Sequence, residues 1–134
     1  MAVIDVAEAD ANEYRWGRAL VVEDEFLIRL DLSETLRDTG WEVVEASSAD
    51  DAMRLLERDC DFNLILTDVH MPGLSNGSDL ARFSKSICPR IKVVVMSGVH
   101  RPCDEEEGVF NLFLSKPIFN LIDKLLPLHS CADD

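Results

Sequence analysis

The residues best suited to chemistry in this sequence come at the ends of short apolar runs. Glu23 and Asp24 follow the first run, Asp68 the third, Ser97 the fourth and Lys116 the fifth. Carboxylates brought together repel one another unless a cation joins them, and a few oxygen ligands with room for water suit Mg²⁺. A carboxylate beside Mg²⁺ and a lysine can attack phosphorus to form an acyl phosphate, while a hydroxyl binds a transferred oxygen. These residue types therefore predict phosphoryl chemistry.

Apolar runs and helical periodicity predict the elements that would position these residues. Five runs rich in Val and Ile predict strands at residues 19–22, 41–44, 62–66, 91–96 and 112–114. Helices are expected between and after them: one ending at Thr39-Gly40, one capped by Ser48, one stopped before Pro89, and one running from Pro117 to Pro127. Strands that alternate with helices imply an α/β fold with a parallel sheet covered on both faces. Ligands of such folds bind beyond the carboxyl ends of the strands, where the polar residues stand.

The fourth crossover differs from the others. Residues Val99 to Gly108 include Pro102 and the acidic run 104–107, with hardly any apolar face. The fourth helix is therefore expected to be short or irregular.

Composition excludes several classes of function. The chain has 134 residues, with 13 Lys plus Arg against 26 Asp plus Glu and a net charge of −13. That charge argues against binding to nucleic acid or to an anionic membrane surface. No apolar run approaches the ~18 residues of a membrane span, and the N-terminus lacks the layout of a signal peptide, so a cytoplasmic protein is expected. The expected organisation is an acidic extension (1–16), one domain (17–128) and a C-terminal tail (129–134).

The four cysteines show no pattern typical of a metal site. Cys60, Cys88, Cys103 and Cys131 form no CxxC pair and have no close histidine partner. The expectation is therefore reduced, mostly structural thiols rather than a zinc site or a disulfide framework.

Five separated motifs resemble one known family. They are Val21-Val22-Glu23-Asp24-Glu25, Leu66-Thr67-Asp68-Val69-His70-Met71-Pro72-Gly73, Val95-Met96-Ser97-Gly98 and Ser115-Lys116-Pro117, together with the aromatic residue Phe113. In this order and on these elements they resemble the receiver domain of bacterial two-component response regulators, over residues 18 to 126. The resemblance implies a flavodoxin-like (βα)₅ sandwich with a five-stranded parallel sheet in the order 2-1-3-4-5.

The resemblance also implies a role for each site residue. Asp68 would accept phosphate from a histidine kinase. Glu23, Asp24, Asp68 and the backbone carbonyl of Val69 would hold Mg²⁺. Ser97 and Lys116 would contact the phosphoryl group, and Ser97 with Phe113 would report the switch. Glu23 replaces the more frequent aspartate, and Phe113 lacks the hydroxyl of the usual tyrosine.

Other roles remain open for individual residues. Asp24 could cap the first helix, and Ser97 could be an ordinary turn serine. Lys116 could be a solvated loop cation, and Phe113 could be a core residue. His70 is expected to be a surface residue beside the site rather than a metal ligand or a phosphorelay histidine.

The predicted function is a response regulator that consists of a receiver alone, because 18 residues follow Lys116. It would take phosphate from a histidine kinase or a histidine phosphotransfer protein and act on a downstream protein target, without being an enzyme. One alternative is a phosphorylation-independent adaptor with the same fold. The other is an aspartyl-phosphate hydrolase, and this is disfavoured because His70 stands where such enzymes usually carry a second aspartate. The sequence leaves the oligomeric state open.

Overall fold

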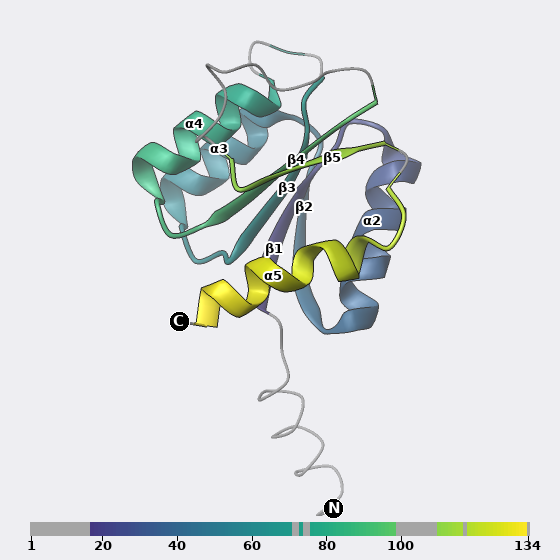
Figure 1. Cartoon of the computed structure of the whole chain (residues 1–134). Helices are drawn as coiled ribbons and strands as arrows, with labels where there is room; N and C mark the ends of the chain where they lie inside the picture. The colour runs from purple at the N-terminus through teal and green to yellow at the C-terminus, as the bar shows by residue number, and fades with distance from the viewer. Residues whose placement is uncertain (1–16, 71–72, 74–75, 99–109, 117, 134) are drawn as a thin grey trace, which may run out of the picture.

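The computed structural model describes residues 17–70, 73, 76–98, 110–116 and 118–133 (Figure 1). Its elements are β1 (Gly17–Val22), α2 (Phe26–Thr39), β2 (Trp41–Ala46), α3 (Ala49–Arg58), β3 (Leu64–Asp68), α4 (Gly77–Ile87), β4 (Lys92–Ser97), β5 (Leu112–Ser115) and α5 (Leu121–Asp133). The strands form one parallel sheet in the order β2-β1-β3-β4-β5, so the predicted α/β, flavodoxin-like topology is confirmed. Within these ranges no helix is long and apolar enough to cross a bilayer.

In the part of the chain that the structure describes, α3 and α4 pack on one face of the sheet and α2 and α5 on the other, which gives three layers (Figure 1). Neighbouring residues of β3 point to opposite faces, as in any strand. Ile65 packs in one core with Leu56 of α3 and Leu80 of α4. Leu66 packs in the other core with Leu36 of α2 and with side chains of α5. The central strand is thus buried on both sides, and its carboxyl end is fixed by two cores.

Local signals set the start of α3 and the ends of α2 and α4 where the sequence predicted them, while the start of α4 is set by a capping box that was not predicted. The Ser48 hydroxyl accepts a hydrogen bond from the Asp51 amide and caps α3. α4 begins with a reciprocal capping box between Asn76 and Asp79 and ends before Pro89. α2 ends at Thr39, and its C-cap residue Gly40 has a φ of 122°, a conformation that favours glycine.

The third and fourth strands extend beyond their apolar runs. β3 includes Asp68, which pairs with Met96, and β4 includes Ser97, which pairs with Ser115. The sequence placed both polar residues just after the strands. The ladder continues because these backbones still find partners in the neighbouring strands, and both side chains are therefore held by the sheet rather than by a loop.

The prediction that the last helix runs from Pro117 to Pro127 is wrong at both ends. α5 begins at Leu121, includes Pro127 and continues to Asp133, so it also takes up residues 129–133, which were assigned to a tail. Proline's fixed φ is compatible with a helix, although one backbone hydrogen bond is lost. Leu125 is buried and Leu128 packs against the same core, and this packing on both sides of the proline offsets the loss.

The expectation of reduced cysteines is wrong for one pair. Cys60 and Cys88 form a disulfide, with their Cα atoms 5.6 Å apart. The two residues are 28 positions apart in sequence, and only the packing of α3 beside α4 brings them together. The predicted extension 1–16 and the crossover 99–108, including Cys103, lie outside the described residues.

Candidate functional site

Three carboxylates meet at the carboxyl ends of β1 and β3. Glu23 and Asp24 directly follow β1, and Asp68 is the last residue of β3. One oxygen of each lies within 4.8 Å of one oxygen of the others. Glu23 is fully buried and Asp68 is 8% exposed, while Asp24 faces solvent. An all-oxygen donor set that is open on one side suits a hard divalent cation such as Mg²⁺.

Lys116 supplies the positive charge of this cluster. It directly follows β5, and its Nζ lies 2.9 Å from Glu23 Oε1 and 3.2 Å from Asp68 Oδ2. The Lys116 amide also donates to the Ser97 carbonyl, over 2.8 Å, which continues the pairing of β5 with β4. The lysine is therefore an ordered member of the site and not a solvated loop cation.

Burial and pairing shift the protonation of this cluster. Burial raises the pKa of the Glu23 carboxyl above its ordinary value, although hydrogen bonds from Lys116 and the Glu25 amide oppose the shift. Burial acts to lower the pKa of Lys116, but its hydrogen bond to Glu23 and the attraction of Asp68 outweigh this and raise it. The ammonium thus stays charged beside the carboxylates at neutral pH.

The backbone around Asp68 is held closely by α4. The Val69 amide donates to the Met96 carbonyl, and the Val69 carbonyl accepts from the Gly77 amide, both over 2.9 Å. A Cβ at Gly77 would stand 2.2 Å from the Asp68 carbonyl oxygen, so any side chain there would force this backbone to shift. A carbonyl oxygen has two lone pairs, so the Val69 carbonyl keeps acceptor capacity for a metal ion.

Asp24 does not cap the helix that follows it. The N-cap residue of α2 is Glu25, and it makes no side-chain cap bond. The first turn of α2 instead presents Arg29, whose Nη1 donates to the Glu23 carbonyl over 2.8 Å and whose Nε lies 3.1 Å from Glu45. Arg29 therefore fixes the turn that carries the two acidic residues.

Sequence reasoning did not single out Arg29 or Gly77. A basic residue near a helix start opposes the helix dipole and was the available signal for Arg29. No sequence signal marked Gly77, because its neighbour in space is the carbonyl of a residue nine positions earlier.

Ser97 and Phe113, predicted as the switch, lie on neighbouring strands. Ser97 is 1% exposed at the end of β4. Phe113 of β5 is half-buried, packs against the core beneath α3 and α4, and lies 6.1 Å from Phe110 between ring centroids. His70 follows Val69 and is exposed, as expected. The geometry places Ser97 at the same sheet edge as the carboxylates, and the switch role of both residues stays a prediction.

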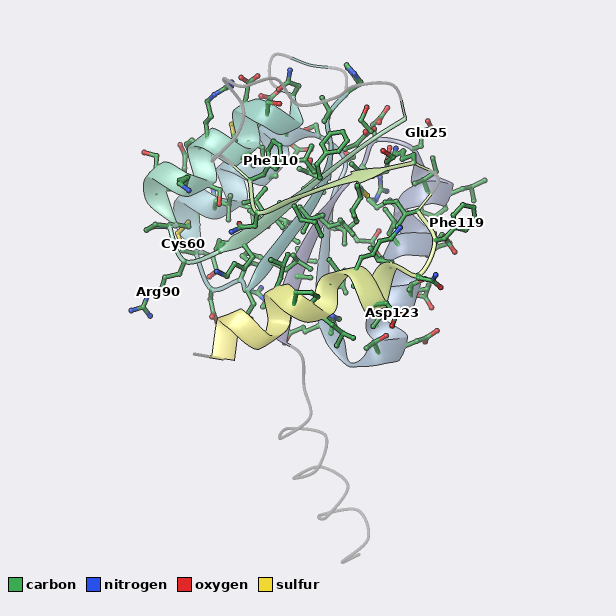
Figure 2. All side chains as sticks on the ribbon, in the orientation of Figure 1. Glu25, Cys60, Arg90, Phe110, Phe119 and Asp123 are labelled. Atoms are coloured by element: carbon green, nitrogen blue, oxygen red, sulfur yellow. A yellow bond between two sulfur atoms is a disulfide. The ribbon has the colours of Figure 1, made fainter. Side chains whose placement is uncertain are left out.

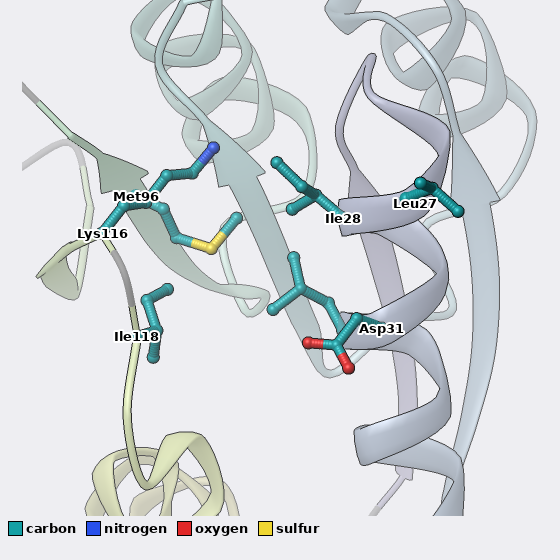
Figure 3. A pocket seen from close by; sticks show the side chains of 7 residues that line it. Leu27, Ile28, Asp31, Met96, Lys116 and Ile118 are labelled. Carbon is teal, nitrogen blue, oxygen red and sulfur yellow. The ribbon is translucent and has the colours of Figure 1, made fainter.

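An apolar groove opens beside the cluster (Figure 3). It has a volume of about 470 Å³ and lies between α2, Met96 of β4 and the chain that follows β5. Its lining residues are Leu27, Ile28, Asp31, Leu32, Met96, Lys116 and Ile118. Lys116 belongs to both the groove and the cluster, so the two features are continuous.

Comparison with known sequences gives one consistent family. The sequence model described as the response regulator receiver domain matches residues 19–122. The chain is 40% identical over 94 residues to the transcriptional regulatory protein PdtaR of Mycobacterium tuberculosis, covering 67% of this chain and 43% of that protein. It is 36% identical over 81 residues to the response regulator protein FleR of Pseudomonas aeruginosa, covering 60% of this chain and 17% of that protein. The chain thus spans less than half the length of these relatives.

Solved structures show the same fold. The response regulator TrrA of Thermotoga maritima, in complex with Mg²⁺-BeF, has a TM-score of 0.74 and 26% identity, covering 84% of this chain and 98% of that one. A response regulator receiver protein from Sinorhizobium medicae has a TM-score of 0.77 and 27% identity, covering 87% of this chain and 96% of that one. Both matches cover more than four-fifths of this chain and nearly all of the other protein's chain.

Proposed function

The chain belongs to the response regulator receiver domain family, and from this membership we propose that Asp68 accepts a phosphoryl group from a phosphohistidine. The observation that carries the proposal is the position of the Asp68 carboxylate: its Oδ2 lies 3.2 Å from Lys116 Nζ, and one of its oxygens lies within 4.8 Å of an oxygen of Glu23 and of Asp24. Phosphorylation would then change contacts with other proteins. TrrA, which is similar in sequence and fold, binds Mg²⁺-BeF, and this supports the same ligand class here.

In the proposed reaction an oxygen of Asp68 attacks the phosphorus of a phosphohistidine. The P–N bond breaks, the imidazole leaves with its electron pair and takes up a proton, and an acyl phosphate remains on Asp68. Lys116 binds the charge on the transferred oxygens, and the Ser97 hydroxyl donates to one of them. Mg²⁺, held by Glu23, Asp24, Asp68 and the Val69 carbonyl, would neutralise phosphoryl charge when bound.

Labelling with acetyl phosphate and Mg²⁺ tests this assignment. We expect one acyl phosphate, trapped by borohydride at Asp68, and no label in Asp68→Asn. Asp123→Asn is the matched control, because Asp123 is an exposed aspartate on α5 and should not affect labelling. Equal labelling of Asp68→Asn and wild type would refute the assignment. Turnover of external phosphomonoesters would instead favour the hydrolase alternative, and partner binding unchanged by beryllofluoride would favour the adaptor.

The groove beside Lys116 is the surface that we propose a phosphohistidine-bearing protein contacts. Leu27, at the start of α2, is 74% exposed and lines the groove, which leads from it to Lys116 of the cluster (Figure 3). Leu27→Ser should slow transfer from a protein donor several-fold and leave labelling by acetyl phosphate unchanged. Ile87→Ser, on the exposed end of α4, is the control and should change neither rate. Equal slowing with both donors would contradict docking at this groove.

A further inference from the structure

The disulfide between Cys60 and Cys88 lies apart from the phosphoacceptor site. Cys60 follows the end of α3, and Cys88 is the C-cap residue of α4 (Figure 2 labels Cys60). Asp68 is at the carboxyl end of the sheet, whereas both cysteines are at the C-terminal ends of the crossover helices, on the opposite side. The proposed phosphoryl chemistry gives this pair no role.

The two sulfurs differ in their access to solvent. Cys60 is exposed, while Cys88 is 4% exposed and belongs to the core beneath α3 and α4. A small reagent can therefore reach Cys60 first, and Cys88 is protected. This difference in exposure suits stepwise thiol–disulfide exchange, in which the accessible Cys60 thiol takes the incoming group and the shielded Cys88 thiol displaces it.

The surroundings of Cys60 can hold the pair in both redox states. Cys60 Sγ lies 3.6 Å from the Leu56 carbonyl oxygen and 3.7 Å from the Ile87 carbonyl oxygen. A reduced thiol at this place would have hydrogen-bond acceptors at the ends of both helices. In the oxidised state the Cα separation of 5.6 Å falls within the range that a disulfide spans, so backbone movement is not needed.

The segment that carries Cys60 is fixed independently of the disulfide. Arg18 Nη1 lies 2.9 Å from Asp59 Oδ2 and donates to the Asp61 carbonyl over 2.9 Å. The guanidinium also stacks 4.4 Å from the centroid of the Phe62 ring. Arg18 thus holds the residues on both sides of Cys60, and the thiol stays near Cys88 when the disulfide is open.

We propose that Cys60 and Cys88 form a reversible exchange site for small disulfides, and that closing it stabilises α3 and α4 against opening. The Cys60 thiolate attacks a disulfide RSSR, which gives a mixed disulfide and releases RS⁻. The Cys88 thiolate then attacks the Cys60 sulfur, forms the Cys60–Cys88 bond and releases a second RS⁻. The two cysteine protons end on the two RS⁻ groups, and excess RSH drives the same steps in reverse.

Peptide mapping in glutathione buffers tests the exchange. The parent is the full chain with Cys103→Ser and Cys131→Ser, equilibrated with mixtures of reduced and oxidised glutathione and then alkylated. Trypsin cleaves after Arg58, Arg82, Lys85 and Arg90, so the disulfide appears as residues 59–82 linked to residues 86–90. We expect this linked pair in oxidising mixtures and two alkylated peptides in reducing ones, reached from either direction. The wild-type chain should give the same linked peptides, which controls for the Cys103→Ser and Cys131→Ser substitutions.

Thermal unfolding tests the consequence for the helices. The closed form should melt higher than the open form by on the order of 10 °C. Hydrogen exchange should slow on closure in α3 and α4, and also in the buried strand β1, because amides that exchange by global unfolding are protected by the higher stability of the closed form. Cys60→Ser keeps the buried Cys88 and should melt at one temperature in every mixture. The proposal is overturned if the linked peptides never form, if they persist in the most reducing mixture, or if closure leaves melting unchanged.

Discussion

Replacing Gly77 by alanine tests how closely α4 is fitted to the phosphoacceptor. Gly77 is the first residue of α4, and its amide donates to the Val69 carbonyl over 2.9 Å. An added Cβ would stand 2.2 Å from the Asp68 carbonyl oxygen and 3.0 Å from Val69 Cα. These atoms are backbone of a buried strand and its exit, so they cannot turn aside as the end of a flexible side chain can.

Two opposing effects decide how much Gly77→Ala lowers the free energy of unfolding. Overpacking of a well-packed region costs about 1–3 kcal/mol. Gly77 has no positive φ, so alanine suits its backbone and recovers about 0.4–1 kcal/mol through the unfolded state. The net expectation is a destabilisation of about 1–2 kcal/mol, or a fall in Tm of roughly 4–8 °C. Since the Asp68 carbonyl must move, the affinity for Mg²⁺ with beryllofluoride should also fall.

Urea and thermal unfolding, with titration of Mg²⁺ and beryllofluoride, measure both effects. Gly98→Ala is the control, because its Cβ would meet only the Lys116 Cβ at 3.9 Å, an ordinary contact. Gly98→Ala should unfold within about 1 kcal/mol of wild type. A Gly77→Ala protein as stable as wild type, with unchanged ligand affinity, would refute the steric argument.

Three further predictions concern charges of the site. Lys116→Met leaves the buried Glu23 without its partner and should lower the free energy of unfolding by about 1–3 kcal/mol in metal-free buffer. Lys124→Met, at an exposed lysine, is the control and should change the free energy of unfolding by less than about 0.5 kcal/mol. Because the pKa of Glu23 is raised above its ordinary value of 4.5, protons compete with Mg²⁺ for this carboxylate at a higher pH than usual. Titration calorimetry should therefore show the affinity for Mg²⁺ falling as the pH drops toward that raised pKa. The same raised pKa makes the metal-free protein less stable as pH rises through the pKa of Glu23. Glu23→Gln should remove the part of both pH dependences that Glu23 contributes. Arg29→Met should weaken Mg²⁺ binding on the order of tenfold, because Arg29 donates to the Glu23 carbonyl and fixes the turn of the metal ligands. Arg37→Met is the control: Arg37 also contacts Glu45, and its loss should leave Mg²⁺ binding unchanged.

The sequence predicted the parts of the fold that depend on local patterns. Apolar runs marked all five strands, and Ser48 and Gly40 marked helix ends through bonds within a few residues. The carboxylates and Lys116 were predicted to meet because parallel strands bring their carboxyl ends to one edge. The structure places Lys116 within hydrogen-bond range of Glu23 and Asp68, and Asp24 within 4.8 Å of both carboxylates.

Features that depend on tertiary neighbours could not be predicted in the same way. Pro127 lies inside α5 because leucines on either side pack on the sheet, and no local rule includes that packing. Cys60 meets Cys88 only where two helices end together. Gly77 is required by a carbonyl in another element. Each of these errors or omissions has the same cause: the deciding partner is distant in sequence.

Coupled binding of Mg²⁺ and beryllofluoride tests the central claim most directly, because the claim is that a metal and a phosphoryl group share the cluster around Asp68. Mg²⁺ is titrated with and without the mimic, and the mimic with and without Mg²⁺. Each should raise the affinity of the other by the same factor, at least about fivefold, because linkage is reciprocal. Asp68→Asn should abolish the coupling, and Asp123→Asn should leave it unchanged. Identical Mg²⁺ affinities with and without the mimic in wild type would contradict the assignment of the site.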